Sequence, residues 1–186
     1  MGVCRPPSSS LVFRHSFVIG HLSFVILALM SQFVPPRPRI ISVKRGFVLV
    51  ASQFNAKYVQ GLVNHCTDEL RVLSPASNVA LYLVPGAFEI PLVVREVALK
   101  KNADAIVALG VILQGETAHA QHLGQVVTSA LQHISLEFGV PVIHAVLSLK
   151  DETQARKRCL EDELNRGTEA ARAAFEMANL IADLRR

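Results

Sequence analysis

Residues 114–119 read QGETAH, a short stretch whose side chains could bind an anion and transfer a proton. The stretch follows an apolar run, so a strand would end here and a helix would begin. Gly115 lets the backbone approach a ligand, and the free N–H groups of a helix starting at Glu116 and Thr117 would attract a phosphate. His119 would stand in the first helical turn, and an imidazole can transfer protons near neutral pH. The stretch therefore predicts either a reaction site or an ordinary helix start capped by Thr117.

Two further stretches place aromatic and acidic side chains where strands are expected to end. Phe54 follows the apolar run 46–52, and Phe88 and Glu89 follow the run 79–85. Each ring could stack on a planar heterocycle, and the Glu89 carboxylate could accept hydrogen bonds from the hydroxyls of a sugar-like chain. The alternative is that Glu89 only stabilises the start of a helix. The fingerprints GxGxxG and GxxxxGK[ST] are absent, which argues against a dinucleotide or a nucleoside triphosphate as the ligand.

A positive partner for a bound phosphate is available at Arg158. Its guanidinium could hold a phosphate through two parallel hydrogen bonds if the last helices fold back over residues 114–119. The alternative is that Arg158 is one solvated charge of the basic run 155–158. The residues leave both interpretations open.

His119, His122 and His133 raise the separate question of a metal site. No carboxylate or cysteine completes a ligand set with them, and the HExxH motif is absent. We therefore expect the site to work without a metal ion.

The elements that must position these residues alternate in type from Arg45 onward. Short β-branched runs predict strands and longer amphipathic runs predict helices, the pattern of βαβ units with a parallel sheet. The predicted strands are residues 46–52, 79–85, 104–113 and 141–149. The predicted helices are residues 55–73, 87–101, 118–138, 151–164 and 168–184, the last two forming one helical region interrupted at 165–167. We expect a flavodoxin-like, three-layer α/β/α sandwich with a four-stranded parallel sheet, in which ligands bind at the carboxyl ends of the strands.

Length and charge favour one domain that binds neither nucleic acid nor a membrane. The chain has 186 residues and is 51% hydrophobic, which is enough to bury a single core. Its formal charge of +4 arises in residues 1–44, which hold five basic residues and no acidic ones. Without these five, 14 of the 19 basic residues remain against 15 acidic ones, so the rest of the chain is close to neutral.

Residues 1–44 are expected to be an N-terminal extension that precedes a domain spanning residues 45–186. The apolar stretch 16–30 is similar to a signal-peptide core but lacks a small-residue cleavage site. We therefore favour a disordered extension or a mis-assigned start, with Met30 as the alternative start. The three cysteines are widely spaced and form no CxxC pair, which favours a reducing cytoplasm.

Four motifs carry a resemblance to a known family. They are VPGAFEIPL (84–92), GVILQGETAH (110–119), PVIHAVLSLKDETQARKRC (141–159) and NRGTEAARAAFEM (165–177). In this order and spacing they resemble the lumazine synthase family of riboflavin biosynthesis. The resemblance covers about residues 45–184.

The resemblance implies a cofactor-free transferase with two small-molecule substrates. These are 5-amino-6-(D-ribitylamino)uracil and 3,4-dihydroxy-2-butanone 4-phosphate, and the products are 6,7-dimethyl-8-ribityllumazine, phosphate and water. By motif, His119 moves protons, and the butanone phosphate is held by Glu116, Thr117 and Arg158. The residues that match the family's ribitylaminouracil site are Phe54, Ala87, Phe88, Glu89, Val111, Ile112, Leu113 and His144.

The chain departs from the family pattern at four positions. The family usually has arginine at the position of Gln114 and often an aromatic residue at that of His144. It has an aromatic and acidic pair where this chain has Ala120 and Gln121. These departures bear on rate and affinity more than on identity, and His144 can still stack on a pyrimidine.

The resemblance also implies a homo-oligomer. Its basic unit is a pentamer, which in the family can pair into a decamer or close into an icosahedral shell of 60 subunits, and riboflavin synthase is a candidate partner. The site is expected to lie between neighbouring subunits. Two other classes compete with the enzyme: a flavin- or lumazine-binding or cage-forming protein without efficient turnover, and a flavodoxin-like electron carrier.

Overall fold

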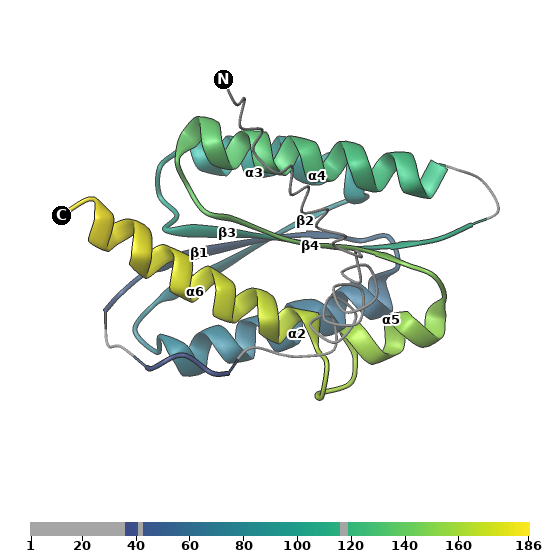
Figure 1. The fold of residues 1–186 in the computed structure, drawn as a ribbon, viewed down its shortest axis with the longest axis horizontal. Coiled ribbons are helices and arrows are strands. Elements are labelled where there is room, and N and C mark those ends of the chain that lie inside the picture. Colours follow the sequence, from purple (N-terminus) through teal and green to yellow (C-terminus); the bar gives the residue numbers. More distant parts are fainter. Residues whose placement is uncertain (1–35, 41–42, 116–118) are drawn as a thin grey trace, which may run out of the picture. The chain divides into compact units, whose positions relative to one another are not determined.

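A four-stranded parallel sheet forms the centre of the fold (Figure 1). The computed structural model describes residues 36–40, 43–115 and 119–186. The strands follow the order β2-β1-β3-β4 across the sheet. Their bounds are β1 (Gly46–Ser52), β2 (Asn78–Val84), β3 (Ala105–Leu113) and β4 (Val142–Leu149). The α/β class and all four predicted strands are confirmed, with strand ends that differ from the prediction by at most one residue.

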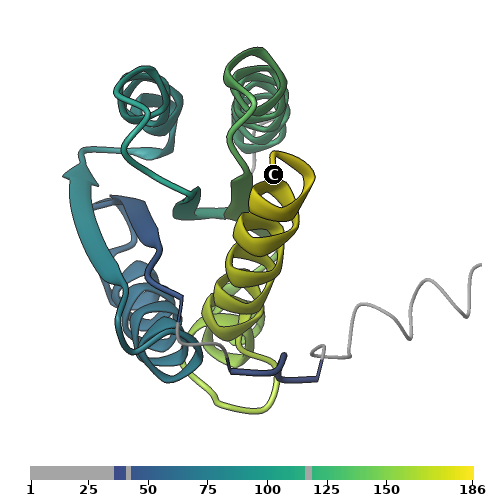
Figure 2. The same cartoon turned by 90° about the vertical axis from the view of Figure 1, so that its left-hand side faces the viewer.

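Helices cover both faces of the sheet and make the three layers (Figure 2). One face packs against α2 (Ala56–Leu73), α5 (Glu152–Cys159) and α6 (Arg166–Leu184), and the other against α3 (Ile90–Leu99) and α4 (His119–Phe138). Successive residues of a strand point to opposite faces, so Leu49 lies in the core under α2 and α6, and Val50 lies in the core under α3 and α4. Among the described residues, no helix is both long and apolar enough to cross a membrane.

The two helices predicted over residues 151–164 and 168–184 are present, but the break between them lies at residues 160–165 and not at 165–167. Helix α5 ends at Cys159, and α6 begins at Arg166 as a separate helix. Asn165 is the N-cap of α6, where its buried side-chain oxygen accepts hydrogen bonds from the backbone N–H groups of Gly167 and Thr168 at 2.8 and 3.4 Å. The prediction places NRG (165–167) in the break between the two helices, whereas its asparagine caps the start of the second one.

The helix predicted over residues 87–101 is also divided. Residues 87–89 form a 3₁₀ turn, η1 (Ala87–Glu89), and the α-helix starts at Ile90. Pro91 stands in the first turn of α3, where its missing N–H leaves no helical hydrogen bond unmade. The turn matters because it presents Phe88 and Glu89 at the end of the sheet.

Two glycines let α2, α5 and α6 pack backbone against backbone. A Cβ atom on Gly61 of α2 would collide with the carbonyl oxygen of Cys159, and one on Gly167 of α6 would collide with that of Leu62. Only glycine fits at such contacts. The contact at Gly61 fixes the position of α5, which carries Arg158 next to Cys159.

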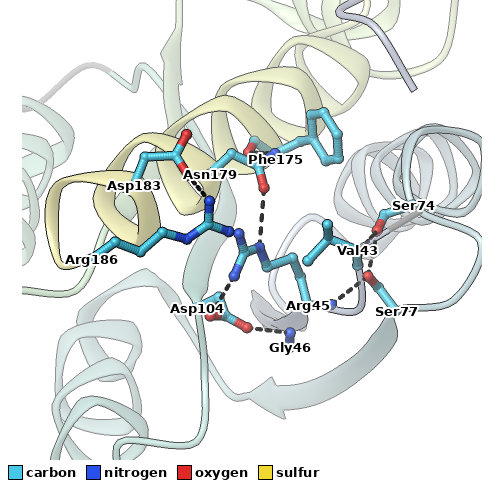
Figure 3. A network of polar contacts seen from close by, with 10 residues as sticks. All are labelled: Val43, Arg45, Gly46, Ser74, Ser77, Asp104, Phe175, Asn179, Asp183 and Arg186. Carbon is cyan, nitrogen blue, oxygen red and sulfur yellow. Dashed lines mark hydrogen bonds and ion pairs between the residues drawn. The ribbon is translucent and has the colours of Figure 1, made fainter. Parts of the chain in front are cut away.

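Polar contacts close the amino end of the sheet (Figure 3). The Arg45 Nε donates to Oδ1 of Asn179 on α6 at 3.0 Å, and the guanidinium lies 3.8 Å from the Asp104 carboxylate. Asp104 accepts a hydrogen bond from the backbone N–H of Gly46 at 2.7 Å. The backbone N–H of Arg45 donates to the Ser77 hydroxyl at 2.8 Å. The starts of β1, β2 and β3 are thus joined to each other and to α6.

A buried carboxylate on α2 binds two arginines. Glu69 is only 5% exposed, and its two oxygens accept hydrogen bonds from Arg37 at 2.9 and 2.7 Å. Arg172 on α6 donates to the same carboxylate at 2.8 Å. The hydrogen bond from Arg37 and the charge of both arginines hold the pKa of Glu69 below its ordinary value, against the effect of burial. Arg37 is thus bound to α2 at the place where α2 contacts α6.

Candidate active site

A cavity of about 370 Å³ opens at the carboxyl end of the sheet. It lies where β1 and β3 end, between η1 and the first turn of α4. Most of the predicted site residues gather in it. The lining residues are Phe54, Asn55, Gly86, Ala87, Phe88, Glu89, Val111, Ile112, Leu113, His119, Ala120 and Leu123.

The turn after β1 is held tightly to its neighbours, although it carries an exposed ring. The backbone N–H of Phe54 donates to the carbonyl of Pro85 at 3.1 Å. Asn55 adopts the left-handed conformation with φ 58°, and its Nδ2 donates to the carbonyl of Val111 at 2.8 Å. The turn therefore joins the ends of β1, β2 and β3 and fixes the position of the Phe54 ring.

Asn55 is a site residue that the sequence analysis did not single out. Its only signal in the sequence is an asparagine between a strand and a helix, because asparagine tolerates the left-handed region better than most residues. The role of its side chain depends on Val111, which is 56 residues away.

The η1 turn gives Glu89 two functions at once. One carboxylate oxygen, Oε2, accepts a hydrogen bond from the backbone N–H of Gly86 at 2.9 Å. The other oxygen, Oε1, accepts none from the described part of the chain. Glu89 thus stabilises the helix start, and its other oxygen has no partner among the described residues, so the two interpretations of its sequence position are compatible.

The rim of the cavity exposes two large rings. Phe54 is 70% exposed and Phe88 is 66% exposed. Exposed aromatic rings at a cavity are surfaces on which a planar ligand can stack, and burial of the rings stabilises the complex.

The start of α4 supplies a histidine to the cavity. His119 is the first residue of α4, is exposed, and lines the cavity together with Leu113 at the end of β3. Glu116 and Thr117, which the sequence analysis assigned to a phosphate, lie outside the described residues. Chain neighbours aside, no atom of the described residues lies within 4 Å of the place where Gly115 would carry a Cβ.

Arg158 lies on α5 and does not line this cavity. Its side chain is half-buried, and burial and the positive charge of Arg166 lower its pKa, while the Glu169 carboxylate acts in the opposite direction. Arg166 and Glu169 form a close ion pair on α6. Two guanidinium groups near each other repel, so an anion bound beside them would be stabilised.

His144 also lies outside the cavity, on the edge strand β4. It lines a separate groove of about 870 Å³ between α4 and β4, where its Nε2 is 2.8 Å from the Thr128 hydroxyl. Gln114, Ala120 and Gln121, three of the positions that depart from the family pattern, line the same groove. One chain alone therefore does not bring His144 and Arg158 to the cavity that holds His119.

The described residues contain no group of three or more His, Cys, Asp or Glu side chains that could hold a metal ion. The chemistry available in the cavity is stacking by Phe54 and Phe88, hydrogen bonding by Glu89, and proton transfer by His119.

Comparison with known proteins identifies the family. The family model for 6,7-dimethyl-8-ribityllumazine synthase matches residues 44–182. A protein of Paraburkholderia phymatum with this name is 40% identical over 137 residues, which cover 73% of this chain and 77% of the relative. A protein of Leptothrix cholodnii with the same name is 39% identical over 137 residues, which cover 73% of this chain and 86% of the relative. The chain therefore belongs to the 6,7-dimethyl-8-ribityllumazine synthase family.

Proposed function

We propose that this protein is an enzyme of riboflavin biosynthesis that makes 6,7-dimethyl-8-ribityllumazine. It condenses 5-amino-6-(D-ribitylamino)uracil with 3,4-dihydroxy-2-butanone 4-phosphate and releases phosphate and water. The observation that carries this proposal is the cavity in which Phe54, Phe88, Glu89 and His119 meet at the carboxyl end of the sheet. It supports the proposal because these are the side chains that a planar, hydroxylated substrate and a proton transfer require.

The pyrimidine substrate would bind in the cavity between the two rings. Phe54 and Phe88 would stack on or flank the planar ring, and the free oxygen of Glu89 would accept hydrogen bonds from the ribityl hydroxyls. The walls formed by Ala87 and by residues 111–113 at the end of β3 are apolar and mostly buried. This arrangement holds the amine of the substrate next to His119.

The reaction needs positioning and proton transfers, and no cofactor. The 5-amino group attacks the ketone carbon, and loss of water gives an imine. Elimination then breaks the C–O bond to phosphate and leaves an enol that tautomerises to a ketone. The ribityl-bearing nitrogen attacks this ketone carbon, and loss of a second water closes the second ring. His119 would transfer protons in these steps, and holding the two reactants together would supply most of the acceleration.

The phosphate of the second substrate would bind at residues 116–117 and Arg158. The start of α4 offers free backbone N–H groups, Thr117 a hydroxyl, and Arg158 a guanidinium.

We further propose that each site is shared by two subunits of a ring. His144 and Arg158 lie outside the cavity of their own chain, so a neighbour would supply them to the His119 cavity. Exposed apolar side chains on the edge strand β2 support such a contact: Leu81 is 44% exposed, Tyr82 is 46% and Leu83 is 56%. A head-to-tail contact of this kind closes into a ring with one site per subunit.

For the assembly we propose a homopentamer, which could pair into a decamer or form a 60-subunit shell that holds riboflavin synthase. We place the protein in the cytoplasm, because Cys66 and Cys159 are free thiols in the described part of the chain. The catalytic domain would comprise residues 45–186, preceded by the extension of residues 1–44.

The direct test of the function is to mix the purified protein with both substrates. Lumazine fluorescence should appear together with one phosphate per lumazine, and neither should appear when one substrate is left out. Tight binding of the pyrimidine without turnover would instead indicate a lumazine- or flavin-binding protein.

A further inference from the structure

Thr128 on α4 and His144 on β4 form a hydrogen-bonded pair in the groove between these two elements. The Thr128 Oγ1 lies 2.8 Å from the His144 Nε2 and 2.7 Å from the carbonyl oxygen of Gly124. Gly124 lets the helix lie this close to the strand, because a Cβ atom there would come within 2.7 Å of the Ser148 hydroxyl. The contact between the two side chains is thus set by the packing of α4 on β4.

The two contacts of Thr128 determine where the proton of His144 lies. A hydroxyl has one proton to donate, and a carbonyl oxygen can only accept. Donation of the Thr128 proton to Gly124, as is common for a threonine within a helix, is the arrangement that satisfies both contacts. Thr128 Oγ1 can then only accept from His144, which requires that Nε2 carry a proton. In the neutral imidazole this leaves the lone pair on Nδ1.

The Nδ1 atom is the polar group that His144 can offer to a ligand. His144 is exposed, and Nδ1 has no hydrogen-bond partner in the described part of the chain. A phenyl ring at this position could stack on a ligand but could accept no hydrogen bond of this strength. The histidine adds an acceptor whose direction is fixed by Thr128.

We propose that Thr128 is a positioning residue that holds His144 as the Nε2–H tautomer, so that Nδ1 accepts a hydrogen bond from the pyrimidine substrate. This inference rests on the proposed function, in which His144 of one subunit contributes to the pyrimidine site of its neighbour. The donor on the substrate is an N–H or O–H group. His144 then contributes to substrate specificity as well as to stacking.

A spectroscopic experiment tests the pair independently of catalysis. Solid-state NMR of protein labelled with ¹⁵N-histidine, recorded at a pH high enough to keep imidazoles neutral, distinguishes the two tautomers in an assembly of any size. Subtraction of the His144→Phe spectrum isolates the His144 signals. We expect the Nε2–H tautomer in the wild type and in Thr128→Ser, and a mixture of tautomers in Thr128→Val. An Nδ1–H tautomer in the wild type, or an unchanged Thr128→Val spectrum, would overturn the assignment.

A kinetic experiment tests the contact with the substrate. Thr128→Val keeps the shape of the side chain but removes the hydroxyl, and it should raise the KM for the pyrimidine about three- to tenfold, as expected for one weakened hydrogen bond. The KM for the butanone phosphate and the thermal midpoint should not change, and Thr128→Ser should restore the wild-type KM. Equal effects on both substrates, an unchanged pyrimidine KM, or a Thr128→Ser variant as impaired as Thr128→Val would overturn the proposal. A wild-type protein that makes no lumazine would instead refute the proposed function, and the tautomer spectrum would still decide the role of Thr128.

Discussion

The two ends of the sheet differ in whether their polar groups have hydrogen-bond partners and whether their aromatic rings are exposed. At the amino end, Arg45 and Asp104 bind each other, and they also bind Asn179 and the backbone of Gly46 (Figure 3). At the carboxyl end, Phe54 and Phe88 are exposed, and one oxygen of Glu89 has no partner among the described residues.

The Ser52 hydroxyl at the end of β1 adds to this contrast. It is buried and has no hydrogen-bond partner in the part of the chain that the structure describes. Buried polar groups are seldom left unpaired without a functional reason. Polar groups at the amino end bind one another within the chain, whereas the carboxyl end presents the Phe54 and Phe88 rings and a Glu89 oxygen at a cavity. Substitutions at the two ends should therefore affect different properties.

The largest effect is expected from His119→Ala at the carboxyl end. It should lower kcat by roughly ten- to a hundredfold, at or below the low end for acid-base residues, because positioning supplies most of the acceleration. The side chain is exposed, so the thermal midpoint should not change. Steady-state kinetics and thermal unfolding check both parts, and full turnover in this variant would remove His119 from the mechanism.

Arg158→Ala should raise the KM for the butanone phosphate about tenfold and spare binding of the pyrimidine, because a charge-assisted contact to the phosphate is lost. The matched control is Lys157→Ala, which removes the same charge from the exposed neighbouring position of α5. Equal losses for both substrates, or the same effect in the control, would contradict a phosphate-binding role for Arg158.

A substitution at the amino end should lower stability and leave activity unchanged. Asp104→Ala removes the acceptor for Gly46 and the ion pair with Arg45, and it should lower the free energy of unfolding by about 1–2 kcal/mol. The thermal midpoint should fall by a few degrees with kcat unchanged. Asp183→Ala is the control, since it removes an exposed ion pair with Arg186 that should contribute little. A loss of turnover in Asp104→Ala at full stability would contradict the claim that the amino end serves stability and the carboxyl end serves activity.

The smallest effect is expected at Glu69, where a fall in pH should lower the stability of the protein. Because its pKa is lower in the folded protein than in the unfolded chain, the ionised carboxylate stabilises the fold above its ordinary pKa, and this contribution is lost as the pH falls. Chemical denaturation of the wild type should therefore show stability declining from about pH 5 toward pH 3. Glu69→Gln should be less stable at pH 7 and should decline less over the same range. Parallel pH profiles of the two proteins would show that Glu69 gains nothing from Arg37 and Arg172.

The sequence predicted most of the fold, because buried parallel strands and amphipathic helices have distinct apolar patterns. It misplaced the break between the last two helices at residues 165–167, since an asparagine close to a glycine can follow the end of one helix or cap the start of the next. Only the buried hydrogen bonds of Asn165 decide between the two.

The sequence also predicted the wall of the cavity, because its residues directly follow strands and the ends of parallel strands meet at one edge. It could not predict the bond from Asn55 to Val111 or the pair formed by Thr128 and His144, which depend on how distant elements pack. The sequence also could not show that His144 and Arg158 lie outside the cavity of their own chain, because this depends on how the chain folds. The family resemblance predicts that a neighbouring subunit supplies these two residues, and this stays a prediction.

The most direct test of a shared site is complementation between two variants. His119→Ala and Arg158→Ala proteins are unfolded, mixed in equal amounts and refolded, and pull-down of differently tagged subunits verifies that mixed assemblies form. Each site needs an unmutated His119 on one subunit and an unmutated Arg158 on its neighbour, so about a quarter of the sites should be wild type. Measured at low concentration of the butanone phosphate, the rate should rise above the mean of the two variants toward about a quarter of the wild-type rate. If mixed assemblies form and the rate stays at that mean, the site lies within one subunit.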